Sequence, residues 1–364
     1  MTAERAGLPR TLRYEPGTLA LLDQRGLPAR CDEVRCTSAE EVASAIRDMV
    51  VRGAPAIGVA AAYGVVLAAR RAAAAEGDIA SVMAAVEVGG DRLIAARPTA
   101  VNLSHAVRRM LDTAHRAAAD GCTTRGLVAG LEETAAGLER FELEASLAMG
   151  RLAADLLPDQ ARLLVHCNAG ALATVERGTA LAAVHELFER GRLAMVYVDE
   201  TRPRLQGARL TAFELDAAGI PHVLVVDSLA PTLMRRGEID AVLVGADRIA
   251  ANGDVVNKVG TYGLAVACTH HDVPLIVVAP TSTIDAACLT GAGIPIEDRG
   301  PGEVVGLGIE RSAPERTPVL NPGFDVTPAA LVHALVTERG VVSPLTPAAI
   351  HQLLTEIPAP AVAE

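Results

Sequence analysis

The chain has 364 residues, a formal net charge of −11 and a sequence pI near 5.4. Half of its residues are hydrophobic and only 2% are aromatic, so the core must be built mainly from Ala, Val, Leu and Ile. This composition is that of a globular protein, and the length favours two domains. The acidic balance argues against general binding to nucleic acid or to a membrane surface, because both need a basic face.

The cysteines and the first residues indicate a cytoplasmic protein. Six cysteines, at positions 31, 36, 122, 167, 268 and 288, include no CxxC pair, which is typical of free thiols in a reducing compartment. The start, MTAERAGLPR, lacks the apolar core of a secretory signal. We also expect no apolar run near the roughly 18 residues of a membrane span, and therefore no membrane partner.

Residues 1–145 are predicted to form a small, mostly helical N-terminal α/β domain. The stretch TLRYEPGTLALLDQRGLPARCDEVRCTSAEE has short alternating runs broken by Pro-Gly and Arg-Gly, a pattern that predicts a small antiparallel sheet. Ser38 with Glu41 forms a capping box that opens a helix toward Met49. From Ile57 to about Glu144 the Ala-rich sequence has helical periodicity.

Residues 146–350 are predicted to form a doubly wound α/β domain. Five aliphatic runs are each followed by a polar or glycine turn: ARLLVHC, LAMVYVDE, PHVLVVD, AVLVGAD and PLIVVAP. Continuous apolar strands alternating with helices predict a parallel sheet covered on both faces, with ligands at the carboxyl ends of its strands. The segment RTPVLNPGFDVTP is interpreted as a return connection, and residues 351–364 as a frayed C-terminal tail.

Polar groups follow the predicted strands and should converge on one crevice. They are His166-Cys167-Asn168, Asp199-Glu200-Thr201-Arg202, Asp227-Ser228, Gly245-Ala246-Asp247 and Pro280-Thr281-Ser282. Cys167 and Asp247 hold similar positions on different strands, so they could face each other as an acid/base pair. Equally, such a cysteine is often a small core residue, and such an aspartate is often a helix N-cap. The residues alone leave the two interpretations balanced.

Three segments carry candidate groups for binding phosphate. In VRGAPAIGVAAAYG, residues 51–64, Arg52 and Gly53 precede a proline at a helix start, where backbone amides and one arginine could hold an anion. ARPTAVNL places Arg97 in a similar loop, and NGDVVNKVGTYG brings Asn257 and Lys258 before a glycine-bounded helix. A capped helix with a surface arginine, and a solvated lysine, are the alternatives.

The sequence predicts no metal and no nucleotide cofactor. His166 and the pair His270-His271 have neither HxxxH nor HxH spacing, and no carboxylate stands at ligand spacing. There is no GxGxxG after a first strand and no GxxxxGK[ST], so the phosphate loops of dinucleotide and P-loop sites are missing.

Several segments, taken in order, resemble the methylthioribose-1-phosphate isomerase family of methionine salvage. They are VRGAPAIGVAAAYG, RPTAVNL, HCNAGALAT, DETRPRLQGARLTAFEL, GADRIAANGDVVNKVGTYGLA, VVAPTSTID and NPGFDVTP, and the resemblance runs from about Leu12 to Pro344. That fold family also includes regulatory subunits of initiation factor 2B and ribose-1,5-bisphosphate isomerase. The resemblance implies a small α/β domain, a Rossmann-like domain, a homodimer, and cofactor-free isomerisation of 5-methylthioribose 1-phosphate, a sugar phosphate, to 5-methylthioribulose 1-phosphate.

Carried over by position, the resemblance assigns roles to nine residues. It implies that Cys167 is the catalytic thiol and Asp247 the catalytic carboxyl. It implies substrate binding by Arg52, Gly53, Ala54, Arg97, Gln206, Asn257 and Lys258. The regulatory relatives generally lack the paired cysteine and aspartate, so this pair favours an enzyme.

One departure and two alternatives accompany the resemblance. The family often carries a tryptophan shortly before the LLDQR segment, where this chain has Tyr14. An isomerase of 5-deoxyribose 1-phosphate or ribose 1,5-bisphosphate would share the same catalytic pair and differ in the group at C5. A non-catalytic regulatory subunit is the alternative from another class.

Overall fold

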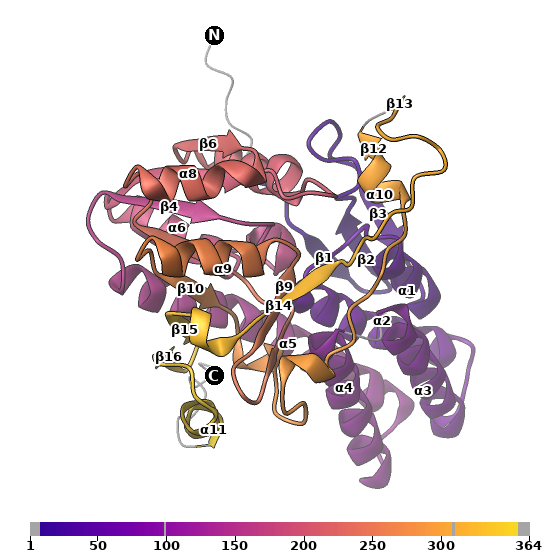
Figure 1. Ribbon diagram of the computed structural model, residues 1–364. Helices are drawn as coiled ribbons and strands as arrows, with labels where there is room; N and C mark the ends of the chain where they lie inside the picture. Colours follow the sequence, from indigo (N-terminus) through magenta and orange to yellow (C-terminus); the bar gives the residue numbers. More distant parts are fainter. Residues whose placement is uncertain (1–7, 98–99, 308–309, 356–364) are drawn as a thin grey trace. The chain divides into compact units, whose positions relative to one another are not determined.

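The computed structural model describes residues 8–97, 100–307 and 310–355, and the chain divides into two compact units (Figure 1). We call residues 8–146 with 170–178 the helical unit, and residues 147–169 with 179–355 the sheet unit. Of the predicted tail, residues 351–355 complete helix α11 (Pro347–Thr355), and residues 356–364 lie outside the described residues. Pro98 and Thr99 of the RPTAVNL segment also lie outside them.

The helical unit begins with the predicted antiparallel sheet. Strands β1 (Leu12–Glu15), β2 (Thr18–Leu22) and β3 (Glu33–Cys36) pair in sequence order. The turn between β1 and β2 contains Gly17 at φ +87°, a conformation that glycine adopts without steric strain.

Five helices complete this unit, as the Ala-rich periodicity predicts. They are α1 (Ala39–Arg47), α2 (Ala54–Ala74), α3 (Ile79–Ala96), α4 (Val101–Ala119) and the first part of α5 (Thr124–Asp155). The predicted cap of α1 is present, since the Ser38 hydroxyl accepts a hydrogen bond from the Glu41 N–H at 3.2 Å. Helix α2 is the centre of the unit and contacts α1, α3 and α4, because alanines and glycines let neighbouring helices approach closely.

Helix α2 corrects one expectation from the sequence. Its 21 residues, with a mean hydropathy of 1.3 in an 18-residue window, are long and apolar enough to cross a membrane, although no such run was expected. Of that window, 72% is buried inside the protein, which is the burial of a core helix.

The sheet unit is built on a seven-stranded sheet of order β16-β15-β10-β7-β4-β5-β6. Its strands are β4 (Ala161–Val165), β5 (Leu193–Asp199), β6 (His222–Val225), β7 (Ala241–Val244), β10 (Leu275–Val278), β15 (Ala334–Thr337) and β16 (Gly340–Val342). All pairs are parallel except β15 with β16, which form an antiparallel pair at one edge. The five predicted aliphatic strands are therefore confirmed.

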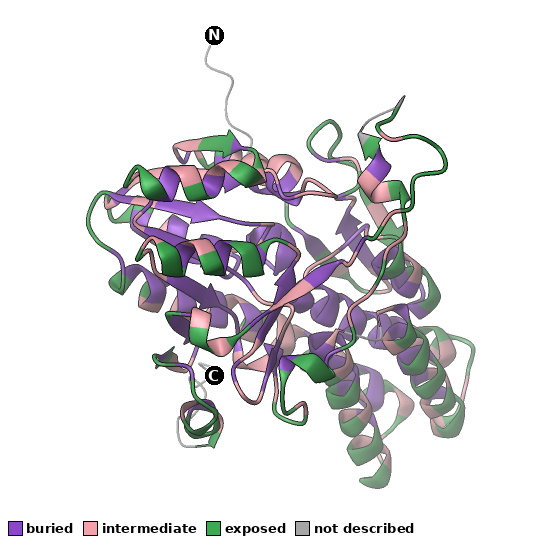
Figure 2. Ribbon diagram, viewed as in Figure 1, coloured by how far each residue is buried: buried purple, intermediate pink, exposed green. Residues whose placement is uncertain are grey.

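Helices cover this sheet, as a doubly wound fold requires. Both faces of β4 are buried, because consecutive residues Leu163, Leu164 and Val165 are each at most 2% exposed (Figure 2). Helices α8 (Ala230–Arg235), α9 (Thr261–His270) and α11 share one apolar cluster with the sheet, α6 (Ala180–Glu189) contacts β5 and β7, and α7 (Ala212–Ala218) contacts β6. The Rossmann-like architecture is confirmed.

The strand order sets where a ligand can bind. The chain runs from β4 outward through β5 and β6, then returns to the other side of β4 with β7, β10 and β15. The direction of winding thus reverses between β4 and β7, whose residues Val165 and Leu243 are register partners. In open α/β sheets the crevice at such a switch point binds the ligand.

A second, four-stranded sheet of order β11-β8-β9-β14 belongs to the same unit. Its strands are β11 (Ile284–Asp285), β8 (Arg248–Ala250), β9 (Val255–Lys258) and β14 (Phe324–Thr327). The segment interpreted as a return connection supplies β14, which pairs antiparallel with β9 and sets Phe324 opposite Lys258. Between β11 and β14 lie α10 (Gly302–Val305) and the short strands β12 (Gly306–Leu307) and β13 (Glu310–Arg311).

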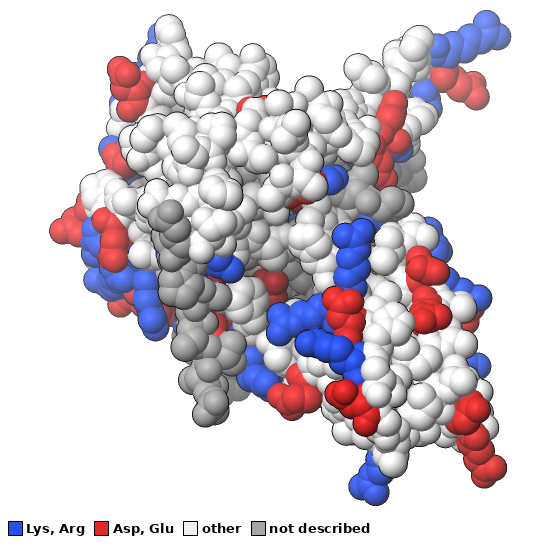
Figure 3. Space-filling model, turned by 90° about the horizontal axis from the view of Figure 1, so that it is seen from below, with Lys and Arg blue, Asp and Glu red and all other residues white. Residues whose placement is uncertain are grey.

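The described surface agrees with the acidic composition. In the view of Figure 3, basic side chains gather in small groups, and acidic side chains lie beside them.

Candidate active site

Cys167 lies just beyond the end of β4 in a conformation that few non-glycine residues adopt. Its φ is +66°, which costs about 1–3 kcal/mol and persists only where the surroundings impose it. Its N–H donates to the Thr201 hydroxyl at 2.8 Å, and its carbonyl accepts a hydrogen bond from the Thr211 hydroxyl at 2.7 Å. Strained residues held in this way cluster at functional sites, so the geometry favours the functional interpretation of this thiol over a core cysteine.

The loop after β5 is itself anchored, and it carries Arg202. Both carboxylate oxygens of Asp227 accept backbone hydrogen bonds, from the N–H of Thr201 and of Arg202, each at 2.7 Å. The Arg202 guanidinium donates to the carbonyls of Pro203 at 3.0 Å and Val304 at 2.6 Å, and no described carboxylate forms an ion pair with it. Two backbone carbonyls thus hold this cation in place.

His166 and Asp199 form a buried pair beside this loop. The imidazole Nδ1 lies 3.0 Å from Asp199 Oδ2, and Nε2 lies 3.0 Å from the Val259 carbonyl oxygen. Possible ligand atoms of His166, Asp199 and Asp227 all lie within 4.8 Å of one another, a spacing that would suit a metal ion. Hydrogen bonds engage both ring nitrogens of His166 and both oxygens of Asp227. The other oxygen of Asp199, Oδ1, is buried and has no hydrogen-bond partner among the described atoms.

Asp247 follows β7, the strand beside β4 at the switch point. It stands between β7 and β8, its N–H donates to the Val256 carbonyl at 2.9 Å, and its side chain is partly exposed. Cys167 and Asp247 therefore follow neighbouring strands on the two sides of the point where the winding reverses. No helix begins directly after Asp247, since β8 follows it, which removes the interpretation of this aspartate as a helix N-cap.

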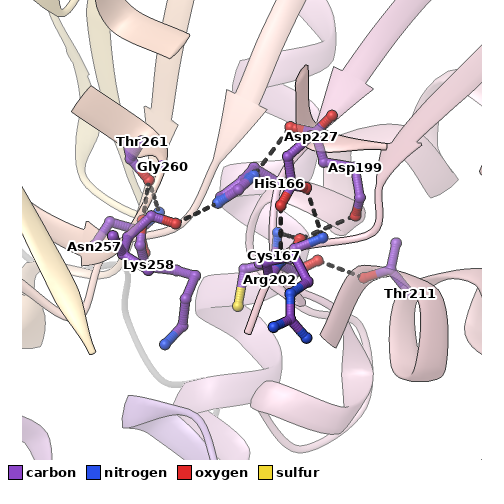
Figure 4. Close-up of polar contacts among 12 residues, drawn as sticks. His166, Cys167, Asp199, Arg202, Thr211, Asp227, Asn257, Lys258, Gly260 and Thr261 are labelled. Atoms are coloured by element: carbon purple, nitrogen blue, oxygen red, sulfur yellow. Dashed lines mark hydrogen bonds and ion pairs between the residues drawn. The ribbon is translucent and has the colours of Figure 1, made fainter. Parts of the chain in front are cut away.

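Lys258 is buried at the end of β9, not solvated. Its residue is 3% exposed, and its ammonium donates to the Gly323 carbonyl at 2.6 Å and lies 4.9 Å from the centre of the Phe324 ring. A buried ammonium is expensive unless it has partners or serves a ligand. Figure 4 shows the side chains of Cys167, Arg202 and Lys258 extending to the same side of the strand ends, which places two cations on the side of the thiol.

Asn257 and Gln206 are buried polar residues of the same unit. Asn257 and Gln206 are each 5% exposed. The Asn257 amide donates to the Thr261 hydroxyl at 3.0 Å. Gln206 precedes the π-helical turn Gly207–Thr211 that supplies Thr211, and its side-chain oxygen has no hydrogen-bond partner among the described atoms. A buried polar atom without a partner is rare and calls for an explanation, and a bound ligand would supply one.

The remaining candidates belong to the helical unit. Gly53 is the N-cap of α2 at φ +97°, and Ala54 is the first residue of that helix, so the predicted helix start with its proline is present. A Cβ at Gly53 would lie 2.5 Å from the Cα atom of Ala173 in the 3-10 turn Ala171–Ala173. Arg52 is partly buried beside it, and Arg97 is the C-cap of α3.

Residues 50–344 of the chain match the initiation factor 2 subunit family. The chain belongs to this family. The methylthioribose-1-phosphate isomerase of Alkalilimnicola ehrlichii is 52% identical to it over 345 residues, which cover 95% of this chain and 97% of the relative.

Two solved structures of related proteins show the same fold over nearly the whole chain. The 5-methylthioribose 1-phosphate isomerase of Pyrococcus horikoshii OT3 has a TM-score of 0.89 and 40% identity, and the match covers 96% of this chain and 97% of that one. The translation initiation factor eIF-2B subunit delta from A. fulgidus has a TM-score of 0.82 and 38% identity, with coverage of 94% and 100%. This member of the initiation factor 2 subunit family is therefore similar both to an enzyme and to a protein named as a translation factor.

The sequence did not predict two residues that contact Cys167 and Lys258. Thr211 and Phe324 were not among the candidates, since a threonine within a helical segment and a phenylalanine after Pro-Gly carry no signal of their own. The DETRPR segment did carry a signal, since Asp199-Glu200-Thr201-Arg202 was recognised as a strand-end polar group, but no role was predicted for its individual residues.

Proposed function

We propose that this protein is a methylthioribose-1-phosphate isomerase, which converts 5-methylthioribose 1-phosphate to 5-methylthioribulose 1-phosphate in methionine salvage. The observation that carries this proposal is the 52% identity, over 95% of the chain, to a relative of that name. The strained Cys167 and Asp247, which follow neighbouring strands at the switch point, support it, because strained residues cluster at functional sites.

The substrate limits the possible chemistry. Its anomeric oxygen carries the phosphate, so the ring cannot open to a free aldehyde as in ordinary aldoses. The bond between C1 and the ring oxygen must break, the ring oxygen must gain a proton, and one hydrogen must pass from C2 to C1. The reaction therefore needs one acid at the ring oxygen and one base near C2.

We assign the acid to Asp247 and the base to Cys167. Asp247 would give its proton to the departing ring oxygen, while Cys167 would take the proton of the 2-hydroxyl as hydride moves from C2 to C1. After turnover, one proton must return from Cys167 to Asp247 to restore the starting protonation. The reaction therefore requires no metal or organic cofactor. On this route, unlabelled substrate turned over in heavy water yields ketose without deuterium at C1. Substantial deuterium at C1 would instead indicate that Cys167 removes the proton from C2 and that the reaction passes through an enolate.

The phosphate requires cations and N–H donors. We assign its binding to Lys258 and Asn257 with Arg52, Gly53, Ala54 and Arg97, as the family resemblance implies. Buried Lys258 supports this assignment, since an ammonium that is already desolvated binds an anion with little further loss of hydration. The amide of Gln206, with its unpartnered oxygen, is suited to a sugar hydroxyl.

A panel of 1-phosphopentoses tests the function. Purified protein should turn over 5-methylthioribose 1-phosphate with a higher kcat/KM than 5-deoxyribose 1-phosphate or ribose 1,5-bisphosphate, which share the reacting carbons and differ at C5. The Cys167→Ala variant, prepared in parallel, controls for contaminating isomerase. A preference for the bisphosphate would reassign the substrate, and no turnover of any sugar would favour a regulatory subunit.

We further propose a cytoplasmic homodimer. All six cysteines are free, which suits a reducing compartment, and the dimer is what the family resemblance implies. Light scattering should give about twice the chain mass of 37.7 kDa, and the mass of a single chain would refute the dimer.

A further inference from the structure

His166 is a buried titratable group with no part in the chemistry assigned above. It directly precedes Cys167 and is 2% exposed, while Asp199 is completely buried. Its Nδ1 faces Asp199 Oδ2 and its Nε2 faces the Val259 carbonyl oxygen, each at 3.0 Å. A fully buried imidazole with two such partners has a single orientation.

The partners fix how many protons this pair holds. A carbonyl oxygen only accepts, so Nε2 of His166 must carry a proton toward Val259. Nδ1 and the Asp199 carboxylate can approach to 3.0 Å favourably only with a second proton between them. Whether that proton resides on nitrogen or on oxygen, the pair as a whole is neutral, which is the state that burial favours.

The surrounding charges agree with this protonation. Burial alone lowers the pKa of His166, but the hydrogen bond and the charge of Asp199 outweigh it and leave the pKa raised. Burial raises the pKa of Asp199, and the charges of Asp227 and Glu200 raise it further against the effect of His166. Both directions favour keeping the shared proton at neutral pH.

The imidazole connects two segments that carry proposed site residues. One is the end of β4 with Cys167, and the other is the connection from β9 to α9, where Val259 directly follows Lys258. The next residue, Gly260, has φ +110°, and a Cβ on it would lie 2.8 Å from the ring Cε1 of His166. The connection is thus in contact with the ring as well as hydrogen-bonded to it, as Figure 4 shows.

We propose that His166 is a positioning residue of the isomerase, which holds the Cys167 segment against the Lys258 segment through its hydrogen bonds to Asp199 and Val259. This inference rests on the proposed function for its kinetic test. The reacting thiol and the phosphate-binding ammonium then keep one separation, and a misplacement of about 1 Å between such groups can reduce the rate on the order of 10²-fold.

Two substitutions of Asp199 separate positioning from stability. In Asp199→Asn, an amide N–H can donate to Nδ1 of a neutral imidazole, so the geometry survives without a shared proton. In Asp199→Ala, Nδ1 has no partner and the ring is free to turn. We expect Asp199→Asn to keep kcat within about tenfold of wild type, and Asp199→Ala to lose on the order of 10²-fold.

Asp240→Ala is the matched control in the same sheet unit. Asp240 also forms a side-chain pair, with Arg162 at 2.6 Å, but this pair is partly exposed and lies at the opposite end of β4 from Cys167. We expect Asp240→Ala to lower the melting temperature while kcat stays near that of wild type. His166→Phe, which keeps a ring but neither hydrogen bond, should fall to the level of Asp199→Ala.

Two results overturn the inference: an Asp199→Asn variant as slow as Asp199→Ala, or an Asp199→Ala variant as fast as Asp240→Ala. A wild-type protein that turns over no sugar phosphate refutes the proposed function instead. The inference is then tested by the alkylation rate of Cys167 with iodoacetamide, followed on its own peptide by mass spectrometry. Asp199→Ala should change that rate several-fold and Asp199→Asn should not, and equal rates in the two variants refute the positioning role.

Discussion

Replacing Gly53 with alanine should destabilise the protein more than any comparable change at an open turn. Gly53 has φ +97° and ψ 134° as the N-cap of α2, a region that residues with a Cβ rarely occupy. A Cβ there would also lie 2.5 Å from the Cα atom of Ala173 and close to its carbonyl oxygen. Both are backbone atoms, so neither can move aside as the end of a flexible side chain would.

The magnitude follows from two separate penalties. The backbone conformation costs alanine about 1–3 kcal/mol. Overpacking against Ala173 adds about 1–3 kcal/mol. Gly53→Ala should therefore lower the free energy of unfolding by roughly 2–6 kcal/mol. Gly17→Ala is the matched control in the same unit, because Gly17 has φ +87° but nothing within 4 Å of its Cβ position, and only the first penalty applies to it.

Urea unfolding followed by circular dichroism measures both variants against wild type. The urea midpoint should fall further for Gly53→Ala than for Gly17→Ala. The free energies of unfolding of the two variants should differ by about 1–3 kcal/mol. At a temperature where both variants remain folded, Gly53→Ala should also raise KM for the sugar phosphate, since the Arg52-Gly53-Ala54 segment is assigned to phosphate binding. Gly17→Ala should leave KM unchanged.

Equal destabilisation by the two substitutions would refute the close packing of Gly53 on Ala173. A KM that stays at the wild-type value in folded Gly53→Ala would instead remove the phosphate from this segment, whatever the stability of the variant.

Four further outcomes test the site and its support. Cys167→Ser and Asp247→Asn should each reduce kcat by about 10²–10⁴-fold with a smaller change in KM, and near-wild-type turnover in either variant would end its assignment. Lys258→Ala should weaken substrate binding by about 1.5–3 kcal/mol, measured as KM or by calorimetry, and unchanged affinity would place the phosphate elsewhere. EDTA should leave activity intact, and loss on chelation with recovery on adding one metal would contradict the cofactor-free mechanism. Burial alone would raise the pKa of Asp254, but hydrogen bonds from Asn252 and from two backbone N–H groups outweigh it and lower that pKa. Because a lowered pKa stabilises the fold above the unfolded value of 3.8 and the effect is lost as pH falls through the folded value, Asp254→Asn should destabilise the protein more at pH 7 than near pH 3 in thermal unfolding. The same loss of stability at both values would contradict that direction.

The sequence by itself determined those helices and strands that are specified by residues close together in the chain. Five aliphatic runs become β4, β5, β6, β7 and β10. The central strands β4, β7 and β10 are buried on both faces, so nearly every position in them must be apolar. The cap of α1 follows from Ser38 and Glu41, since a side-chain oxygen three residues before an N–H satisfies it within one turn. The position of Cys167 at a strand end was also readable, as polar residues interrupt the apolar run there.

Tertiary structure alone decided the order of the strands and the environment of the candidate residues. Parallel pairing joins distant segments, so nothing near β4 in the sequence indicates that β7 lies beside it and puts the switch point between Cys167 and Asp247. Strand β14 was not predicted as a strand, because its four residues alternate between apolar and polar side chains over too short a stretch to distinguish a strand from a loop, and its partner β9 lies far away in the sequence.

The burial of Lys258 could not be predicted from the sequence either, because its partners are distant in the chain. A lysine beside glycine-rich sequence is ordinarily solvated, and this one is buried because Gly323 and Phe324, more than 60 residues later, supply a carbonyl at 2.6 Å and a ring at 4.9 Å. His166 is similar, since its two partners come from β5 and from the connection after β9. Burial and hydrogen bonding between distant segments exist only once the chain has folded, and they distinguish a functional cation or imidazole from an ordinary one.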